Sequence, residues 1–259
     1  MFRLHTLYLL FLIELFALNL GAAEKPYIIS GFDDVLRQAE NTGILKATIK
    51  ILETDKTFSG MSELYTIHAN QEAVPKFIIV SAISSWFDGR IDSFLIDSKF
   101  PAHRRYLRNW LTQWSIEDFK INKIKEVLTE RPGRRFIIIF DNSDASLALA
   151  NKLHEQFPTQ IQAIYLRQVI KKDIPSSATS FFTAFDIALA EFAADRMTAN
   201  EVEIVGHAIL KEQETAMLFP IYSICPKSYN ACKNVSAAIL PICIKVQDHV
   251  QSLCRYREQ

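Results

Sequence analysis

Three short apolar runs, separated by segments with helical spacing, limit the folds that this chain can adopt. The runs are FIIVS (residues 77–81), RFIIIF (135–140) and IQAIYL (161–166), and YIIS at Tyr27–Ser30 is a fourth. A strand that is apolar along its whole length needs cover on both faces, which is typical of parallel sheets connected by helices. The sequence therefore predicts an α/β fold with a doubly wound, mostly parallel sheet.

The remaining elements follow from the spacing of apolar residues. It predicts a short strand at Tyr106–Trp110 and helices at Thr42–Leu52, Gly60–Asn70, Ile91–Ile96, Asn122–Glu130, Ser143–Gln156 and Phe181–Arg196. No repeat or linker interrupts residues 24–200, so we expect one domain there. Residues 201–259 form a C-terminal extension, in which residues 238–253 are compatible with a helix.

The charge balance excludes one large class of function. The 259 residues include 29 Lys and Arg against 29 Asp and Glu, so the formal net charge is zero. A nucleic-acid-binding protein needs a basic excess to displace phosphate counterions, so we expect no nucleic-acid partner. The chain is long enough to bury a sizeable core. It has only 7 Gly, which is few for a protein with phosphate-binding loops.

The first 23 residues have the order of a secretory signal peptide. Arg3 precedes two apolar runs, and Gly21 and Ala23 supply the small residues of a cleavage site. A membrane anchor is the alternative, but Glu14 interrupts a stretch already short of the roughly 20 residues that span a bilayer. No second stretch of that length follows. We expect an exported protein, periplasmic or secreted, without a transmembrane segment in the mature chain.

Four cysteines lie near the carboxyl end. Their spacing lacks a zinc-binding pair, and an even number in an exported chain predicts two disulfides. Four reduced, buried cysteines are the alternative. If residues 238–253 are helical, the last two cysteines lie about 16 Å apart, beyond disulfide reach. Each of the first two should therefore pair with one of the last two: Cys225, Cys232, Cys243 and Cys254.

Polar residues follow the predicted strands, where ligands bind in such sheets. Asp33 and Asp34 follow the first strand, Ser81 ends the second, Lys123 lies in the helix before the third, and Asp141 ends that strand. Carboxylates suit Mg²⁺, and a hydroxyl and an ammonium group suit phosphate. Each residue alone has a structural explanation, such as a helix cap, a solvated lysine or a turn hydroxyl. Their order favours a phosphate and Mg²⁺ site.

This order resembles the haloacid-dehalogenase superfamily, and within it the actin-patch-type phosphatidate phosphatases. IISGFDDVL is similar to the superfamily's first motif, and FSGMSELYTIHANQEAVPKFIIVSAISSWF to the region around its second. NKIKEVLTERPGRRFIIIFDNSD resembles the segment that carries the third and fourth motifs. Shorter similarities are KFPAHRRYLRNW, IQAIYLRQV and FFTAFDIALAE, so the resemblance covers about residues 27–195.

The resemblance implies a role for each residue that matches a motif. Gly31 takes the place of the aspartate that attacks phosphorus and binds Mg²⁺, so the nucleophile is missing. Asp33 matches the second aspartate, which is the general acid and base and a metal ligand. Ser81 matches the hydroxyl that binds phosphate, and Lys123 matches the lysine that binds phosphate and stabilises charge.

The fourth motif is altered as well. Asp141 matches its metal-binding acid. In the family this acid lies between two glycines, and here the residues on either side are Phe140 and Asn142-Ser143. Asp144 is the candidate for the second acid of the motif. The resemblance therefore implies a Mg²⁺ site that is weakened or absent.

Three functions remain compatible with the sequence. The first is a non-catalytic relative that binds a phosphate-containing ligand or lipid phosphate. The second is an active Mg²⁺-dependent phosphatase of phosphate monoesters that uses Asp33 or Asp34. The third is a non-enzymatic interaction module whose protein partner is unknown. Replacing Gly31 by aspartate is expected to improve Mg²⁺ binding and restore activity in part. Any membrane contact should be peripheral.

Overall fold

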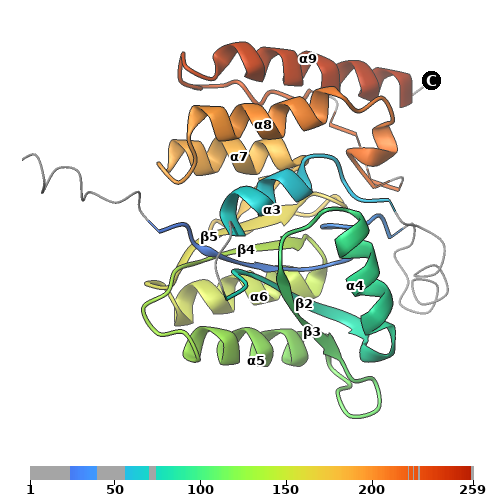
Figure 1. Ribbon diagram of the computed structural model, residues 1–259, viewed down its shortest axis with the longest axis vertical. Coiled ribbons are helices and arrows are strands. Elements are labelled where there is room, and N and C mark those ends of the chain that lie inside the picture. Colours follow the sequence, from blue (N-terminus) through green and yellow to red (C-terminus); the bar gives the residue numbers. More distant parts are fainter. Residues whose placement is uncertain are drawn as a thin grey trace, which may run out of the picture.

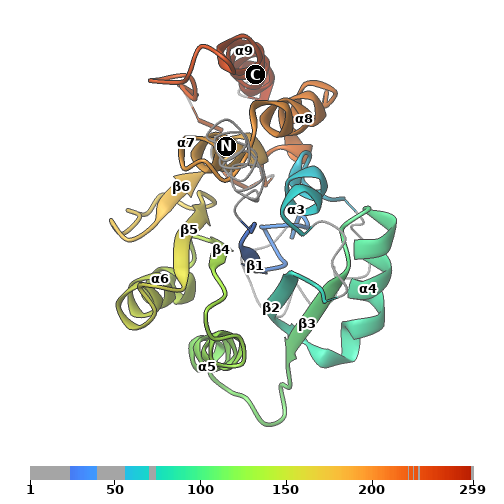
Figure 2. The same ribbon diagram turned by 60° about the vertical axis from the view of Figure 1, so that its left-hand side comes forward.

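A computed structural model describes residues 24–39, 56–69, 74–220, 222–223, 225–226 and 228–257 of the chain. The predicted signal peptide and the predicted helix Thr42–Leu52 lie outside the described residues. Figures 1 and 2 show a central sheet with helices on both faces. Further helices stack on those that cover one of the two faces.

The sheet confirms the predicted α/β class. Its six strands are parallel and lie in the order β3-β2-β1-β4-β5-β6. β1, β2, β4 and β5 are the four apolar runs. The strands are β1 (Tyr27–Ser30), β2 (Phe77–Ser84), β3 (His103–Arg108), β4 (Phe136–Asp141), β5 (Ile161–Arg167) and β6 (Thr179–Phe181).

The helices divide between the two faces of the sheet. α5 (Ile116–Thr129) and α6 (Asp144–Gln156) cover one face, and α3 (Met61–Ala69), α4 (Asp88–Asp97) and α7 (Ala184–Ala193) pack against the other. Successive residues of β1 alternate between the two cores: Ile28 belongs to one and Ile29 to the other. Both side chains have no exposed surface, which explains why the strand is apolar throughout.

Most predicted elements that fall among the described residues are confirmed, and several differ in their bounds: β2 ends at Ser84 rather than Ser81, and α4 is Asp88–Asp97 rather than Ile91–Ile96. β3 is His103–Arg108 rather than Tyr106–Trp110. α5 begins six residues before the predicted Asn122, because the Ser115 hydroxyl caps it by accepting the Asp118 backbone N–H at 3.1 Å. Phe181 ends strand β6 instead of starting a helix.

The C-terminal extension packs on the domain as further helical layers. α8 (Ala199–Leu210) lies against α7 and α3, and α9 (Leu240–Arg257) lies against α8 (Figure 1). Gly206 permits this close approach, because a Cβ atom there would lie 2.8 Å from Ile242. Buried residues of α8 and α9 belong to the same core as β1 and β2. In the described part of the chain, no helix combines the length and hydropathy needed to cross a membrane.

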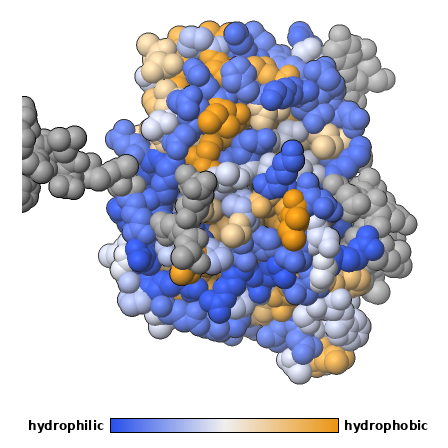
Figure 3. All heavy atoms as spheres, viewed as in Figure 1, coloured by the Kyte–Doolittle hydropathy of each residue, from blue (hydrophilic) through white to orange (hydrophobic). Residues whose placement is uncertain are grey.

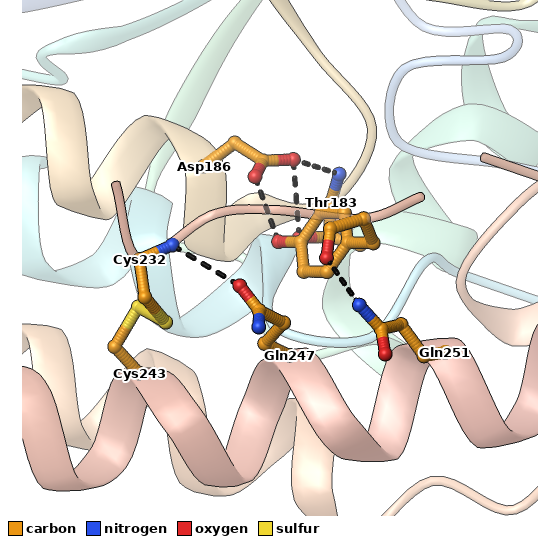
Figure 4. The surroundings of a disulfide bond; sticks show 7 residues. Thr183, Asp186, Cys232, Cys243, Gln247 and Gln251 are labelled. Atoms are coloured by element: carbon orange, nitrogen blue, oxygen red, sulfur yellow. Dashed lines mark hydrogen bonds between the residues drawn. A yellow bond between two sulfur atoms is a disulfide. The ribbon is translucent and has the colours of Figure 1, made fainter. Parts of the chain in front are cut away.

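Two disulfides hold the extension together. Cys225 pairs with Cys254 and Cys232 pairs with Cys243, with Cα–Cα distances of 5.6 and 5.7 Å. Each early cysteine therefore bonds a later one, as the helical spacing predicted. Disulfides of this kind are typical of proteins in an oxidising compartment. Figure 4 shows the second disulfide beside α9, where Gln247 accepts a hydrogen bond from the Cys232 backbone.

Candidate functional site at the carboxyl ends of β1 and β4

The candidate site lies where β1 and β4 end side by side. Ser30 of β1 pairs with Ile139 of β4 and with Ile79 of β2. The backbone N–H of Gly31 continues this pairing and donates to the Ile139 carbonyl at 2.9 Å. Since the strands are parallel, the residues that follow them come to the same edge of the sheet. The structure thus places Gly31, Ser81 and Asp141 at one edge.

The side chain of Phe140 occupies the space beside Gly31. A Cβ atom built on Gly31 would lie 2.9 Å from Cδ1 of Phe140 and 3.2 Å from a methyl group of Val35. Phe140 is 1 % exposed and forms part of the core between the sheet and α5. Any side chain at position 31 therefore requires the Phe140 ring to move. The Phe140 ring thus limits the space for a side chain at position 31.

Asp33 forms an ion pair within its own loop. Both Nε and Nη2 of Arg37 donate to Asp33 Oδ1, at 3.2 and 2.8 Å. The Arg37 side chain is 3 % exposed and that of Asp33 is 26 % exposed. Burial raises the pKa of Asp33, and the Arg37 guanidinium opposes this shift. The carboxylate in the general acid and base position is thus already paired with a fixed cation.

Asp34 lies in an environment that disfavours its charged form. Its backbone has a φ of 57°, a left-handed conformation that aspartate adopts more readily than most residues. Burial is the main reason that its pKa rises to about 8; the nearby carboxylates of Asp33 and Asp141 contribute to this rise, and a hydrogen bond with the Tyr222 hydroxyl opposes it. Asp34 is therefore a protonated carboxyl group over much of the physiological pH range.

Asp141 and Asn142 are bound by their own surroundings. Asp141 Oδ1 accepts the Ser143 backbone N–H at 2.7 Å and lies 3.5 Å from the Ser146 hydroxyl. The Asn142 side chain is buried and hydrogen-bonds the backbone of Val169 and Ile170. Asn142 therefore connects the loops after β4 and β5. The side chain of Asp144, the first residue of α6, lies outside the described atoms.

The lysine beside the site is Lys120, one helical turn before the predicted Lys123. Lys120 is 7 % exposed, and its ammonium group lies 4.9 Å from the centre of the Phe140 ring and lowers the pKa of Asp33. Lys123 instead pairs with Glu126 at 2.5 Å and stacks over Tyr106. Lys120 could have been recognised in the sequence, because it lies three residues before Lys123 on the apolar side of the same helix.

Ser81 lies in β2 at the same edge and faces its own loop. It is 5 % exposed, and its hydroxyl accepts the backbone N–H of Ile83 at 3.3 Å. The pairing of β2 with β3 shifts between Ser81 and Ser84, which marks a bulge. The predicted phosphate hydroxyl thus has a hydrogen-bond partner within the bulge.

The comparison with protein families agrees with this arrangement. The model for "Phosphatidate phosphatase APP1, catalytic domain" matches residues 27–168, which is more than half of the chain. The chain belongs to this family. The match extends from β1 through β5 and thus includes every strand end described above. Neither a curated protein nor a solved structure matches the chain.

The residues of the site do not fit the Mg²⁺ ion that the family implies. Gly31 supplies no ligand, the Asp33 carboxylate is paired with Arg37, and Lys120 adds a positive charge beside Phe140. Mg²⁺ requires oxygen ligands in near-octahedral geometry, mostly carboxylates and water. Among the described residues, no group of three or more His, Cys, Asp or Glu side chains could hold a metal ion.

Proposed function

We propose that this chain is an exported, phosphatidate-phosphatase-like protein that does not hydrolyse phosphate esters and acts by binding. The observation that carries the proposal is the contact between Gly31 and Phe140: the phenyl ring fills the space that a nucleophilic side chain would need. The family's reaction, as the resemblance implies it, begins with attack of a carboxylate at this position on phosphorus. Glycine provides no such group.

Neighbouring acids are poorly placed to replace it. Asp33 lies two residues after Gly31, where the chain already bends away from β1, and an error of about 1 Å can cost a hundredfold in rate. Its carboxylate is also held by Arg37 at 2.8 Å. Asp34 is mostly protonated near neutral pH, since burial raises its pKa to about 8, and a protonated carboxyl group is a weak nucleophile.

Export forms the second part of the proposal. The signal-like order of residues 1–23 supports it, and so do the two disulfides of the extension. Cleavage would leave Glu24 as the first residue, whose carboxylate pairs with Lys76 and Arg134 at 3.4 and 2.6 Å. Mass spectrometry of protein from the expressing cells should find Glu24 at the amino terminus and no free thiols. An intact amino terminus with four alkylated cysteines would contradict export.

Phosphate release tests the loss of activity. We expect that the wild-type chain with Mg²⁺ releases phosphate from phosphatidate and from small phosphate monoesters no faster than these compounds release it in buffer alone. The motif alone predicts that Gly31→Asp restores activity in part, but the new side chain meets Phe140, so we expect this variant to remain inactive. Gly31→Asp combined with Phe140→Gly makes room for the carboxylate and removes the ring beside Lys120, and is expected to gain Mg²⁺ affinity and measurable activity.

Two results would change the conclusion. Robust wild-type turnover that Asp33→Asn abolishes would establish an active phosphatase with a displaced catalytic acid. Turnover that is indifferent to Asp33, Lys120 and Asp141 would show that the site lies elsewhere. Phe140→Gly alone is the matched control, since it opens the same space without adding a nucleophile. Circular dichroism of each variant separates lost folding from lost chemistry.

A further inference from the structure

The chain carries all of its tryptophans on one projecting part of the surface. The 3 Trp residues follow β2 and β3: Trp86 lies in the 3₁₀ helix Ser85–Phe87, and Trp110 and Trp114 lie in the loop before α5. Trp86, Leu111 and Trp114 are 73 %, 67 % and 84 % exposed. We call residues 82–87 and 109–115 the tryptophan tip. Figures 1 and 2 both show its second segment projecting at the bottom of the molecule.

The projecting loop is closed by its own hydrogen bonds. The Asn109 side chain accepts the Leu111 backbone N–H at 3.0 Å, and the Gln113 side chain accepts that of Asn109 at 2.8 Å. The carbonyl of Asn109 accepts the backbone N–H groups of Thr112 and Gln113. Four backbone N–H groups of the loop therefore have partners within it, which lowers the cost of removing these groups from water.

The two segments of the tip are tied into one surface. The indole N–H of Trp110 donates to the Ala82 carbonyl at 3.0 Å, and Arg108 donates to the same carbonyl at 3.3 Å. Arg108 also donates to the Trp114 carbonyl at 3.1 Å, and its guanidinium stacks over the Trp110 ring. Trp110 and Arg108 thus anchor the loop, and they leave Leu111 and Trp114 free to contact another surface.

The charge of the tip indicates what kind of surface this is. Charged residues make up 22 % of the chain, yet residues 82–87 and 109–115 contain none. Among the ionic groups at its border, Asp88 pairs with Arg105 at 2.8 Å and Lys123 with Glu126 at 2.5 Å, while Arg108 donates to backbone carbonyls. In Figure 3 the projecting loop ends in pale and orange atoms. Such a neutral, apolar tip complements a surface without net charge and has no means of attracting a strongly charged one.

We propose that the tryptophan tip inserts into the headgroup layer of a zwitterionic lipid bilayer. Tryptophan favours this layer because its ring is apolar and its N–H is polar. Leu111 would reach the first part of the acyl chains, and the paired ions at the border would remain in water. The tip lies beside the carboxyl ends of β2 and β3, so insertion turns the Gly31 edge of the sheet toward the membrane. The proposal does not depend on the activity of that site.

The tryptophans themselves provide the measurement. Since all of them lie at the tip, the intrinsic fluorescence of the full chain reports only on this surface. Vesicles of phosphatidylcholine should shift the emission to shorter wavelength, and phosphatidylcholine brominated near the top of the acyl chains should quench it. Sedimentation with the same vesicles gives the bound fraction. Binding should be the same in 50 and 500 mM salt, because no charge attraction contributes to it.

Variants locate the binding surface. Leu111→Ser and Trp114→Ser should each weaken vesicle binding about tenfold, as expected for loss of one buried large apolar side chain. Ile204→Ser is the control, because Ile204 is also exposed, at 44 %, but lies on α8. Equal binding by Leu111→Ser, Trp114→Ser and wild type would overturn the proposal. So would unchanged fluorescence with vesicles, as expected for a protein-docking tip, or binding confined to anionic vesicles and lost in salt.

Discussion

Two regions of this molecule bury polar groups in different ways. The first is the Gly31 site, formed by Gly31, Asp33, Asp34, Lys120 and Asp141 at the end of β1 and β4. The second is the extension junction, where Arg167, Thr183, Asp186 and Tyr229 join the sheet to the C-terminal extension. Both lie at or near the carboxyl edge of the sheet, and both contain charged side chains with little exposure.

At the extension junction most buried polar groups have hydrogen-bond partners, and Figure 4 shows those of Thr183 and Asp186; Nε of Arg167 has none among the described residues. The Tyr229 hydroxyl donates to Asp186 Oδ1 at 2.7 Å, and Asp186 Oδ2 accepts the backbone N–H groups of Phe182 and Thr183, both at 2.8 Å. Arg167 donates to the carbonyls of three separate segments and lies between the rings of Phe58 and Phe181. This is the arrangement expected where polar groups stabilise a fold.

At the Gly31 site burial raises the pKa of Asp33 and of Asp34, and neighbouring acids add to this rise. The Asp33 and Asp141 carboxylates both disfavour ionisation of Asp34. Grouping acids at one buried edge costs stability unless a bound cation or a reaction requires them. This difference is expected if, as proposed above, the first region is the remnant of a site for chemistry and the second is structural. Mutations should therefore destabilise the junction and leave the Gly31 site tolerant.

Arg167→Met should have the largest effect. The methionine fills much of the space but leaves the carbonyls of Val35, Phe182 and Leu218 without this donor. We expect a loss of about 3–5 kcal/mol in the free energy of unfolding, measured with urea. Arg104→Met is the matched control, because the Arg104 side chain is 53 % exposed on β3. Equal stability of the two variants would remove the distinction between the regions.

Removing a disulfide should have the next largest effect. The Cys225–Cys254 bond closes a loop of sequence separation 29, and the Cys232–Cys243 bond one of 11. The chain-entropy estimate gives about 3.5 kcal/mol for Cys225→Ser with Cys254→Ser and about 3 kcal/mol for Cys232→Ser with Cys243→Ser. Hydrogen exchange should show the loss first in α9, with β1 and β4 still protected. Loss of protection in the sheet before α9 would contradict a separable extension.

The sequence predicted the strands that are covered on both faces. β1, β2, β4 and β5 are apolar at nearly every position because each side chain faces a core. The edge strands were harder to predict. β3 reads HRRYLR, since most of its side chains are only partly buried, and β6 has three residues, of which two are exposed. Neither produces an apolar run.

The site was predictable in its order along the chain but not in its contacts. The glycine at position 31, where the resemblance implies an aspartate, could be read from the motif alone. That the Phe140 ring fills the space beside it depends on the register of β1 and β4, which a single sequence does not specify. Lys120 was missed because the predicted helix began at Asn122, whereas α5 begins at Ile116 and includes Lys120. The cysteine pairing was predictable only in part: the rise of a helix excludes a bond between Cys243 and Cys254 but leaves two arrangements, of which the structure shows one.

Tyr229→Phe tests a single bond of the junction. It removes the hydroxyl that donates to Asp186 and lies 3.1 Å from the Thr183 hydroxyl, while the ring stays in place. Leaving a buried carboxylate with one donor fewer should cost about 1–3 kcal/mol in the free energy of unfolding. Tyr27→Phe provides the comparison, since that ring packs on Phe136 in the opposite core. A cost below that of Tyr27→Phe would show that the Asp186 hydrogen bond adds nothing to stability.

Asp34→Asn should have the smallest effect on stability. Unlike the other variants, it should stabilise the protein. In the folded chain burial raises the pKa of Asp34 to about 8, whereas its ordinary value is 3.8. Between these values the folded state binds a proton that the unfolded state has released, so this group makes stability fall as pH rises from about 4 to about 8. Asparagine cannot ionise and also tolerates the left-handed backbone found here, a φ of 57°.

The variant should match the wild type at pH 4 and exceed it at pH 9 by about 1 kcal/mol, a value reduced for partial exposure of the carboxyl group. Urea unfolding at pH 4, 6, 8 and 9 measures how the stability of the variant and of the wild type changes with pH. Asp97→Asn, an exposed position on α4, controls for the change in net charge. A variant less stable than wild type at pH 9 would mean that the Asp34 carboxylate stabilises the fold. The Gly31 site would then resemble the junction, and the remnant interpretation would be wrong.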